Sequence, residues 1–157
     1  MAAADLTGPG RPALVLDTNI YILDAAGLLP ATVAQLLDRA LLFHCAACLA
    51  ELAVGVANAD PALPGWTTLR GHYARLFEGL PANRVLVPDG QTWTEAGLVA
   101  GTLARIQGFQ PWQRKQCLND AAIYLTAAKA GLPVLTGNTV NFDLIQQIAP
   151  DGRFIHF

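Results

Sequence analysis

The sequence predicts a single α/β domain in three layers, with helices on both faces of a parallel sheet of about four or five strands. Short runs of Val, Leu and Ile alternate with longer amphipathic or Ala-rich segments along the chain, which is the pattern of repeated strand–helix units. The length of 157 residues and the hydrophobic content of 53% suit one domain with a substantial core. Right-handed crossovers would then place the carboxyl ends of the strands along one edge of the sheet.

The domain is predicted to begin at residue 13. Residues 1–12 are small, polar and interrupted by Gly and Pro, so we expect a flexible N-terminal arm there and a single domain over residues 13–157. Residues 13–16 are apolar and end abruptly at Asp17, a residue that can cap a following helix. This run is the predicted first strand.

The other expected elements continue the alternation. Each strand is predicted from a short apolar run, and each helix from apolar residues spaced three and four positions apart. The remaining strands are expected at residues 41–46, 85–87, 133–136 and 154–157. Helices are expected at residues 23–29, from Pro30 onward, and at 47–56, 66–80, 93–106, 119–130 and 142–148, with a basic loop over 108–115.

Composition narrows the classes of function. Ten Lys and Arg against twelve Asp and Glu give a net charge of -2, so nucleic-acid binding would need a local basic patch or a bound metal. Three cysteines cannot all pair with one another and nothing resembles a signal peptide, which predicts a cytoplasmic protein. No apolar stretch approaches the roughly 20 residues that cross a bilayer, so we expect no membrane span.

Three acids fall where ligands usually bind in such sheets. Asp17 ends the first strand, Glu51 lies in an apolar helix after the second, and Asp120 starts the helix before the fourth. Crowded carboxylates stay ionised most readily by binding a hard divalent cation through oxygen. The sequence therefore predicts a Mg²⁺ or Mn²⁺ site suited to phosphodiester hydrolysis with a metal-activated water.

Each of these residues also has a purely structural interpretation. Asp17 alone could be a helix N-cap, and Asp120 alone could be an acid favoured at a helix start. Glu51 is harder to explain in this way, because its neighbours on both sides are apolar. Cys45 and Cys48 form a C-x-x-C sequence, but without a second pair we interpret them as core residues rather than a zinc or redox site.

Four segments, in order, resemble the motifs of PIN-domain proteins. They are residues 14–19 (LVLDTN), 49–55 (LAELAVG), 119–123 (NDAAI) and 135–144 (LTGNTVNFDL). The subgroup that they resemble most is the VapC-like ribonuclease toxins of bacterial toxin–antitoxin pairs. The resemblance spans nearly the whole chain after the first 12 residues.

This resemblance implies a three-layer PIN-like fold and a metal-dependent endoribonuclease. In that family pattern Asp17, Glu51 and Asp120 form the catalytic acidic cluster, with Asp17 and Asp120 as the direct ligands of Mg²⁺ or Mn²⁺. Thr18 and Asn19 would orient the first acid and the water network. The supporting residues that the resemblance implies are Thr18, Asn19, Thr136, Asn138, Asn141 and Asp143.

One position departs from the family pattern. Where many relatives carry an acid just before the Phe of the last motif, this chain has Asn141, and the nearest carboxylate is Asp143 on the other side of Phe142. An amide is a poorer ligand than a carboxylate, so we expect one firmly held ion. Whether Asn141 and Asp143 together replace the usual fourth acid is open.

Basic residues near the acids are candidates for contacts with an RNA backbone. Arg114 and Lys115 lie just upstream of Asp120, and Arg105 is on the preceding helix, although a solvated basic turn would explain them equally well. Trp112 could stack on a base or cover the core.

The family resemblance also implies partners. An antitoxin would place its C-terminal segment in the groove near the acids. The helix expected over 66–80 carries an apolar face that could bind this partner or form a homodimer, or could simply pack on the core. The residues of this face are Leu69, Tyr73, Leu76 and Phe77.

Two other functions compete with a toxin. Asn141 motivates a catalytically weak PIN-like RNA-binding module, and a solitary RNA-processing nuclease would share the same site. A phosphatase of the haloacid-dehalogenase type, with Asp17 as nucleophile, is disfavoured because the acid that such enzymes carry two residues later is here Asn19.

Overall fold

A parallel sheet of five strands forms the centre of the computed structural model, which describes residues 1–3 and 10–157. The strand order is β3-β2-β1-β4-β5, and each neighbouring pair is parallel. β1 is therefore central, with two strands on either side. The strands are β1 (Ala13–Leu16), β2 (Leu41–Cys45), β3 (Val85–Leu86), β4 (Val134–Thr136) and β5 (Phe154–His156).

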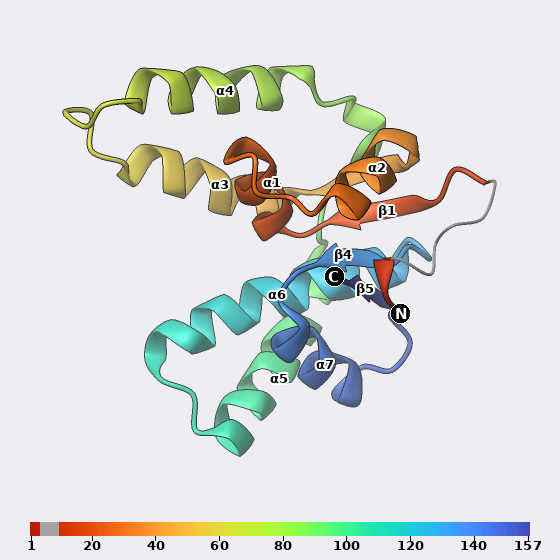
Figure 1. Cartoon of the computed structure of the whole chain (residues 1–157). Helices are drawn as coiled ribbons and strands as arrows, with labels where there is room; N and C mark the ends of the chain where they lie inside the picture. The colour runs from red at the N-terminus through yellow and green to blue at the C-terminus, as the bar shows by residue number, and fades with distance from the viewer. Residues whose placement is uncertain (4–9) are drawn as a thin grey trace.

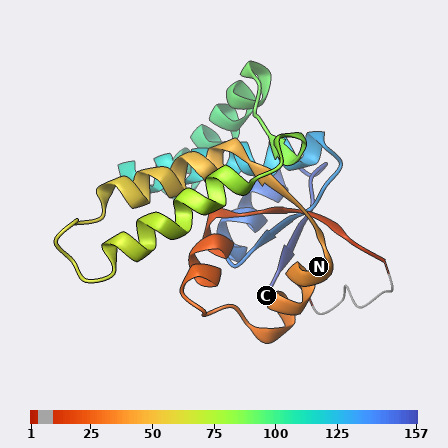
Figure 2. The ribbon, with the colours of Figure 1, turned by 90° about the horizontal axis from the view of Figure 1, so that it is seen from above.

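Helices cover both faces of this sheet, which confirms the predicted three-layer α/β architecture. Figure 1 shows α1 to α4 on one side of the sheet and α5 to α7 on the other. Viewed from above, α3 and α4 form a hairpin that extends beyond the sheet (Figure 2). The helices are α1 (Thr18–Ala25), α2 (Ala31–Arg39), α3 (Ala46–Asn58), α4 (Trp66–Gly79), α5 (Gly90–Gln107), α6 (Pro111–Lys129) and α7 (Thr139–Ile148), and a short 3-10 turn (Ala82–Arg84) precedes β3.

The register of the strands aligns their carboxyl ends. Leu16 of β1 pairs with His44 of β2 on one side and with Leu135 of β4 on the other. The next residue of each strand therefore lies at the same edge of the sheet. Asp17, Cys45 and Thr136 occupy those positions, and the chain turns into helices α1, α3 and α7 from this edge.

The sheet is buried because helices pack on both of its faces. Leu14, Val15, Val134 and Leu135 are inaccessible to solvent, as expected for strands of a parallel sheet. The three cysteines, Cys45, Cys48 and Cys117, are buried as free thiols, and the Cys48 Sγ donates to the backbone oxygen of Leu16. The interpretation of the C-x-x-C sequence as part of the core is thus confirmed.

Several expected boundaries are wrong: α5 and α7 begin at Gly90 and Thr139, three residues before their expected starts, and two larger differences have identifiable reasons. The helix expected at residues 23–29 begins already at Thr18, because the Asp17 carboxylate accepts the Thr18 N–H and starts α1 directly after β1. Gly27, at φ 67°, then follows the end of that helix. The loop expected over 108–115 is largely helical, because Pro111 occupies the first turn of α6 and Gln110 and Gln113 cap it reciprocally.

The two ends of the chain lie close to each other in Figure 1. Ala2 forms a parallel bridge with His156 of β5, and the His156 N–H donates to the Met1 backbone oxygen. Residues 4–9 lie outside the described residues, so the flexible arm expected over 1–12 stays a prediction. None of the helices in the described part of the chain is both long and apolar enough to cross a bilayer.

Helix α4 uses most of its apolar face within the molecule. Tyr73 is buried, and Leu76 and Phe77 pack against the core, whereas Leu69 is exposed. Intramolecular packing therefore accounts for three of the four residues proposed as a partner surface.

Candidate active site

Asp17 is the most buried acid of the site, with 3% of its surface exposed at the junction of β1 and α1. Its Oδ1 accepts the Thr18 backbone N–H at 2.7 Å, which is the N-cap contact of α1. Its Oδ2 accepts the Thr136 hydroxyl at 2.6 Å and the Asn19 side-chain amide at 2.5 Å. Asp17 thus caps a helix and also presents a carboxylate at the edge of the sheet.

Asp120 approaches the same edge from helix α6 and is 5% exposed. Its Oδ2 accepts the side-chain amides of Asn138 at 3.1 Å and of Asn141 at 2.8 Å. The Asn138 backbone N–H in turn donates to the Thr136 hydroxyl at 2.8 Å. Thr136 and Asn138 therefore connect Asp17 and Asp120 through one hydrogen-bond network.

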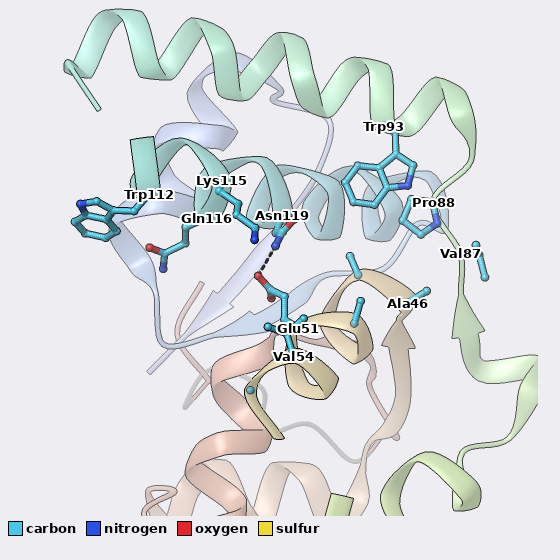
Figure 3. A pocket seen from close by; sticks show the side chains of 13 residues that line it. Ala46, Glu51, Val54, Val87, Pro88, Trp93, Trp112, Lys115, Gln116 and Asn119 are labelled. Carbon is cyan, nitrogen blue, oxygen red and sulfur yellow. Dashed lines mark hydrogen bonds between the residues drawn. The ribbon is translucent and has the colours of Figure 1, made fainter. Parts of the chain in front are cut away.

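Glu51 extends from helix α3 and is half-buried. Its Oε2 accepts the Thr18 hydroxyl. Its Oε1 accepts the Asn119 side-chain amide at 2.6 Å, and Figure 3 shows this second contact. Thr18 also bonds to Asp17 through its backbone N–H, so it links Glu51 to the other two acids. The three segments expected to supply acids do meet at one site.

Asn119 is the residue of this site to which sequence reasoning assigned no role. Trp112, Lys115, Gln116 and Asn119 recur three or four positions apart on α6, and all four line the cavity beside Glu51 (Figure 3). This spacing marks one face of a helix and is the signal in the sequence that points to Asn119. Because the sequence predicts a loop over residues 108–115, Trp112 and Lys115 are not counted there in a helical pattern.

The electrostatics of the site reflect burial and mutual repulsion. Burial raises the pKa of Asp17 to about 6, and the Glu51 charge adds to this effect, although hydrogen bonds from Thr136 and Thr18 oppose it. Burial raises the pKa of Asp120 to about 7, with further contributions from the charges of Asp17 and Glu51. The three carboxylates therefore lie close enough to repel one another.

No basic side chain neutralises these acids within residues 1–3 and 10–157, where the one ion pair joins Lys129 to Asp89. A buried anion with no positive charge beside it is energetically costly, and a bound cation would reduce that cost. Mg²⁺ commonly binds through one or two carboxylates and keeps several waters, which suits the oxygens of Asp17 and Asp120. The described residues contain no group of three or more His, Cys, Asp or Glu that could hold a metal ion.

Asp143 lies away from this network. It is exposed on α7, and the Gln147 side chain on the same helix donates to it at 2.9 Å. Asn141, in contrast, lies at the site and donates to Asp120. Of these two residues, the structure therefore brings Asn141 to Asp120 and leaves Asp143 outside the hydrogen-bond network.

Two cavities flank the acids. The larger, of about 670 Å³, lies between α3 and α6 and is lined by Glu51 and Asn119 together with Trp112 and Trp93 (Figure 3). The second, of about 390 Å³, is lined by Asn19 and Asn138, which donate to Asp17 and Asp120. Gln116 of α6 lines both cavities.

The basic candidates separate in the structure. Lys115 lines the large cavity beside Glu51. Arg105 and Arg114 line a different cavity of about 430 Å³ between α5 and α6, where the Arg114 Nε donates to the Phe109 backbone oxygen. Trp112 is 67% exposed, so it does not cover the core. The three basic residues therefore do not form one group: Lys115 lies on one side of α6, and Arg105 and Arg114 line a cavity on another side.

Fold and site together define an α/β protein with an acidic cluster at the carboxyl edge of a parallel sheet. Solved structures with a similar fold include VapBC2 from Rickettsia felis bound to a DNA fragment from its promoter, with a TM-score of 0.63 at 16% identity over 92% of this chain and 98% of that chain. FitAcB from Neisseria gonorrhoeae gives a TM-score of 0.63 at 23% identity over 92% and 96% of the two chains. VapBC-5 from Mycobacterium tuberculosis, a member of the VapBC family of toxin–antitoxin systems, gives 0.58 at 26% identity over 94% and 100%.

No protein-family model matches the chain, and no curated protein matches it significantly. The structural likeness covers more than nine-tenths of this chain in each of these three cases. It confirms the fold of a VapC-like PIN-domain protein, which the four sequence motifs predicted.

Proposed function

We propose that this protein is a divalent-metal-dependent endoribonuclease and the toxin of a toxin–antitoxin pair. The observation that carries the proposal is the hydrogen-bonded cluster of Asp17, Glu51 and Asp120, which come from three separate segments and have no ion-pair partner in the described part of the chain. The likeness to VapBC and FitAcB structures supports the same assignment.

Asp17 and Asp120 are the proposed ligands of Mg²⁺ or Mn²⁺. Asn19, Thr136, Asn138 and Asn141 hold them by donating to their Oδ2 atoms, so that each acid keeps a fixed orientation. A bound ion would supply Lewis acidity to the attacking water and would balance the charge that develops on the phosphate.

Glu51 is the proposed proton acceptor. It lines the large cavity, in which an RNA strand could approach the acids, and its oxygens are held by Thr18 and Asn119. When water attacks phosphorus, a new P–O bond forms, one P–O ester bond breaks, Glu51 takes a proton from the water, and the departing RNA oxygen takes a proton from solvent. Lys115 and Trp112 line the same cavity and suit a phosphate and a base, respectively.

The antitoxin part of the proposal rests on the large cavity as well. Ala50, Val54 and Trp93 give it an apolar wall that ends at Glu51, and such a groove suits an amphipathic segment of a partner. A partner bound there would cover the acids and exclude RNA.

A second candidate is an RNA-binding module with weak or no catalysis. The observation that favours it is Asn141, whose amide donates to Asp120 where a carboxylate would add negative charge for a metal. This module would use the same cavity to bind RNA without cutting it.

An RNA cleavage assay distinguishes the nuclease from the RNA-binding module. Purified protein is incubated with single-stranded RNA and with Mg²⁺, Mn²⁺ or a chelator, and the products are resolved by gel. We expect cleavage that requires the metal and is lost in Asp17→Asn and Asp120→Asn. RNA binding without metal-dependent cleavage would contradict the nuclease and favour the module. A short DNA-binding protein encoded next to this chain would distinguish a toxin from a solitary RNA-processing nuclease.

A further inference from the structure

We propose, as a step that rests on the nuclease function above, that Asn119 is a positioning residue which sets the orientation of Glu51. Asn119 is on α6, directly before Asp120, and its amide donates to the Glu51 Oε1 at 2.6 Å (Figure 3). The contact joins residues 68 positions apart in the sequence, so it also ties α3 to α6.

Both Glu51 oxygens are held by neutral donors. The Thr18 hydroxyl contacts Oε2 and the Asn119 amide contacts Oε1, while the carboxylate lines the large cavity. A glutamate side chain has several rotatable bonds, so two donors at its end limit the positions that the carboxylate can take. The lone pairs that remain free are available on the cavity side.

Asn119 is the donor dedicated to Glu51. Thr18 bonds to both Glu51 and Asp17, so replacing it would disturb two acids at once. The donors to Asp120 are Asn138 and Asn141 instead. Because successive residues of a helix point about 100° apart, Asn119 and Asp120 face different parts of the site.

Asn119→Ala should therefore act on the chemical step and leave metal binding unchanged. Without its donor, the Glu51 Oε1 would be free to leave the position from which it accepts a proton. Supporting residues of this kind commonly affect activity roughly 10- to 100-fold. We expect kcat to fall by about that factor, with KM and the Mn²⁺ dissociation constant from calorimetry within about twofold of the original chain.

Asn119→Asp separates positioning from packing. Aspartate has nearly the same size as asparagine, so a packing role would tolerate it, but it places a charged oxygen against the Glu51 carboxylate instead of an N–H donor. We expect Asn119→Asp to lower kcat more than Asn119→Ala does. Asn58→Ala, at an exposed position at the end of α3, is the matched control and should change neither constant.

A second measurement does not depend on catalysis. In chelator, Asn119→Asp should lower Tm in the original chain but not in a Glu51→Gln background, because the Gln amide can donate to the new Asp. Equal losses of Tm in both backgrounds, an Asn119→Ala variant with unchanged kcat, or weakened Mn²⁺ binding in that variant would overturn the proposal. If no RNA is cleaved at all but the two Tm losses differ as expected, the nuclease function fails and the Asn119–Glu51 contact stands.

Discussion

The Thr136 hydroxyl of β4 donates to the Oδ2 of Asp17 at 2.6 Å and accepts the Asn138 backbone N–H at 2.8 Å. One side chain therefore joins the end of β1 to the start of α7, across 119 positions of sequence between Thr136 and Asp17. Thr136 has no solvent exposure, so water cannot replace either hydrogen bond.

Thr136→Val should destabilise the protein although it preserves the shape of the side chain. It removes the donor to Asp17 and the acceptor for Asn138, and an unsatisfied buried polar group costs about 1–3 kcal/mol. We expect a loss of that size in the free energy of unfolding from urea titration. Thr68→Val, at an exposed position on α4, is the control. A loss no larger than that of the control would contradict the role assigned to Thr136.

In chelator, the protein should become less stable as the pH rises from about 4 to 7. Burial raises the pKa of Asp17 from 3.8 to about 6 and that of Asp120 to about 7, so the folded state holds more protons than the unfolded chain in this window. The stabilisation is complete below about pH 4 and is lost as the pH passes the folded values. The slope is up to about 1.4 kcal/mol per pH unit for each carboxyl. Asp120→Asn should reduce this slope, and an unchanged slope would argue against the assignment to Asp120.

Mn²⁺ should stabilise the protein at pH 7.5, because it compensates the charge of Asp17 and Asp120. A ligand at 100 times its dissociation constant adds about 2.7 kcal/mol to the free energy of unfolding. We expect the rise in Tm to disappear in Asp17→Asn and Asp120→Asn but to persist in Glu51→Gln, since Glu51 is held by Thr18 and Asn119 instead. Loss of the Mn²⁺ effect in Glu51→Gln would make Glu51 a ligand.

Asn141→Asp should change the number of ions bound. The Asn141 amide donates to Asp120, and a carboxylate in its place would add a negative oxygen next to the site. We expect calorimetry to give one Mn²⁺ per chain for the original sequence and two for the variant, together with a lower Tm in chelator from carboxylate repulsion. Two ions bound by the original chain would show that Asn141 does not limit the number of ions that the site holds.

Lys115→Gln should weaken RNA binding more than Arg105→Gln does. Lys115 lines the cavity beside Glu51, whereas Arg105 lines a separate cavity between α5 and α6. Loss of one phosphate contact lowers the slope of the logarithm of the binding constant against the logarithm of the salt concentration by about one. Fluorescence anisotropy with labelled RNA in chelator, at several salt concentrations, measures both effects. Equal losses in the two variants would point to a binding surface that includes both sides of α6.

The sequence pattern alone predicts the layers of the fold and the edge of the sheet at which the acids lie. Short apolar runs alternating with amphipathic segments predict a parallel sheet, and Asp17 at the end of such a run must lie at its carboxyl edge. These features are local, because burial periodicity and capping act over a few residues. The start of α6 at Pro111 was missed, since its cap is formed by two glutamines rather than by Ser, Thr, Asp or Asn.

Only the tertiary structure decided which side chains meet at that edge. Strand order brings Thr136 to Asp17, and the packing of α3 against α6 brings Asn119 to Glu51. Asp143 and Asn141 are two positions apart on α7, yet one faces solvent and the other reaches Asp120. Such contacts depend on helix rotation and rotamers set by the whole core, and these are determined by long-range packing that no short stretch of sequence contains.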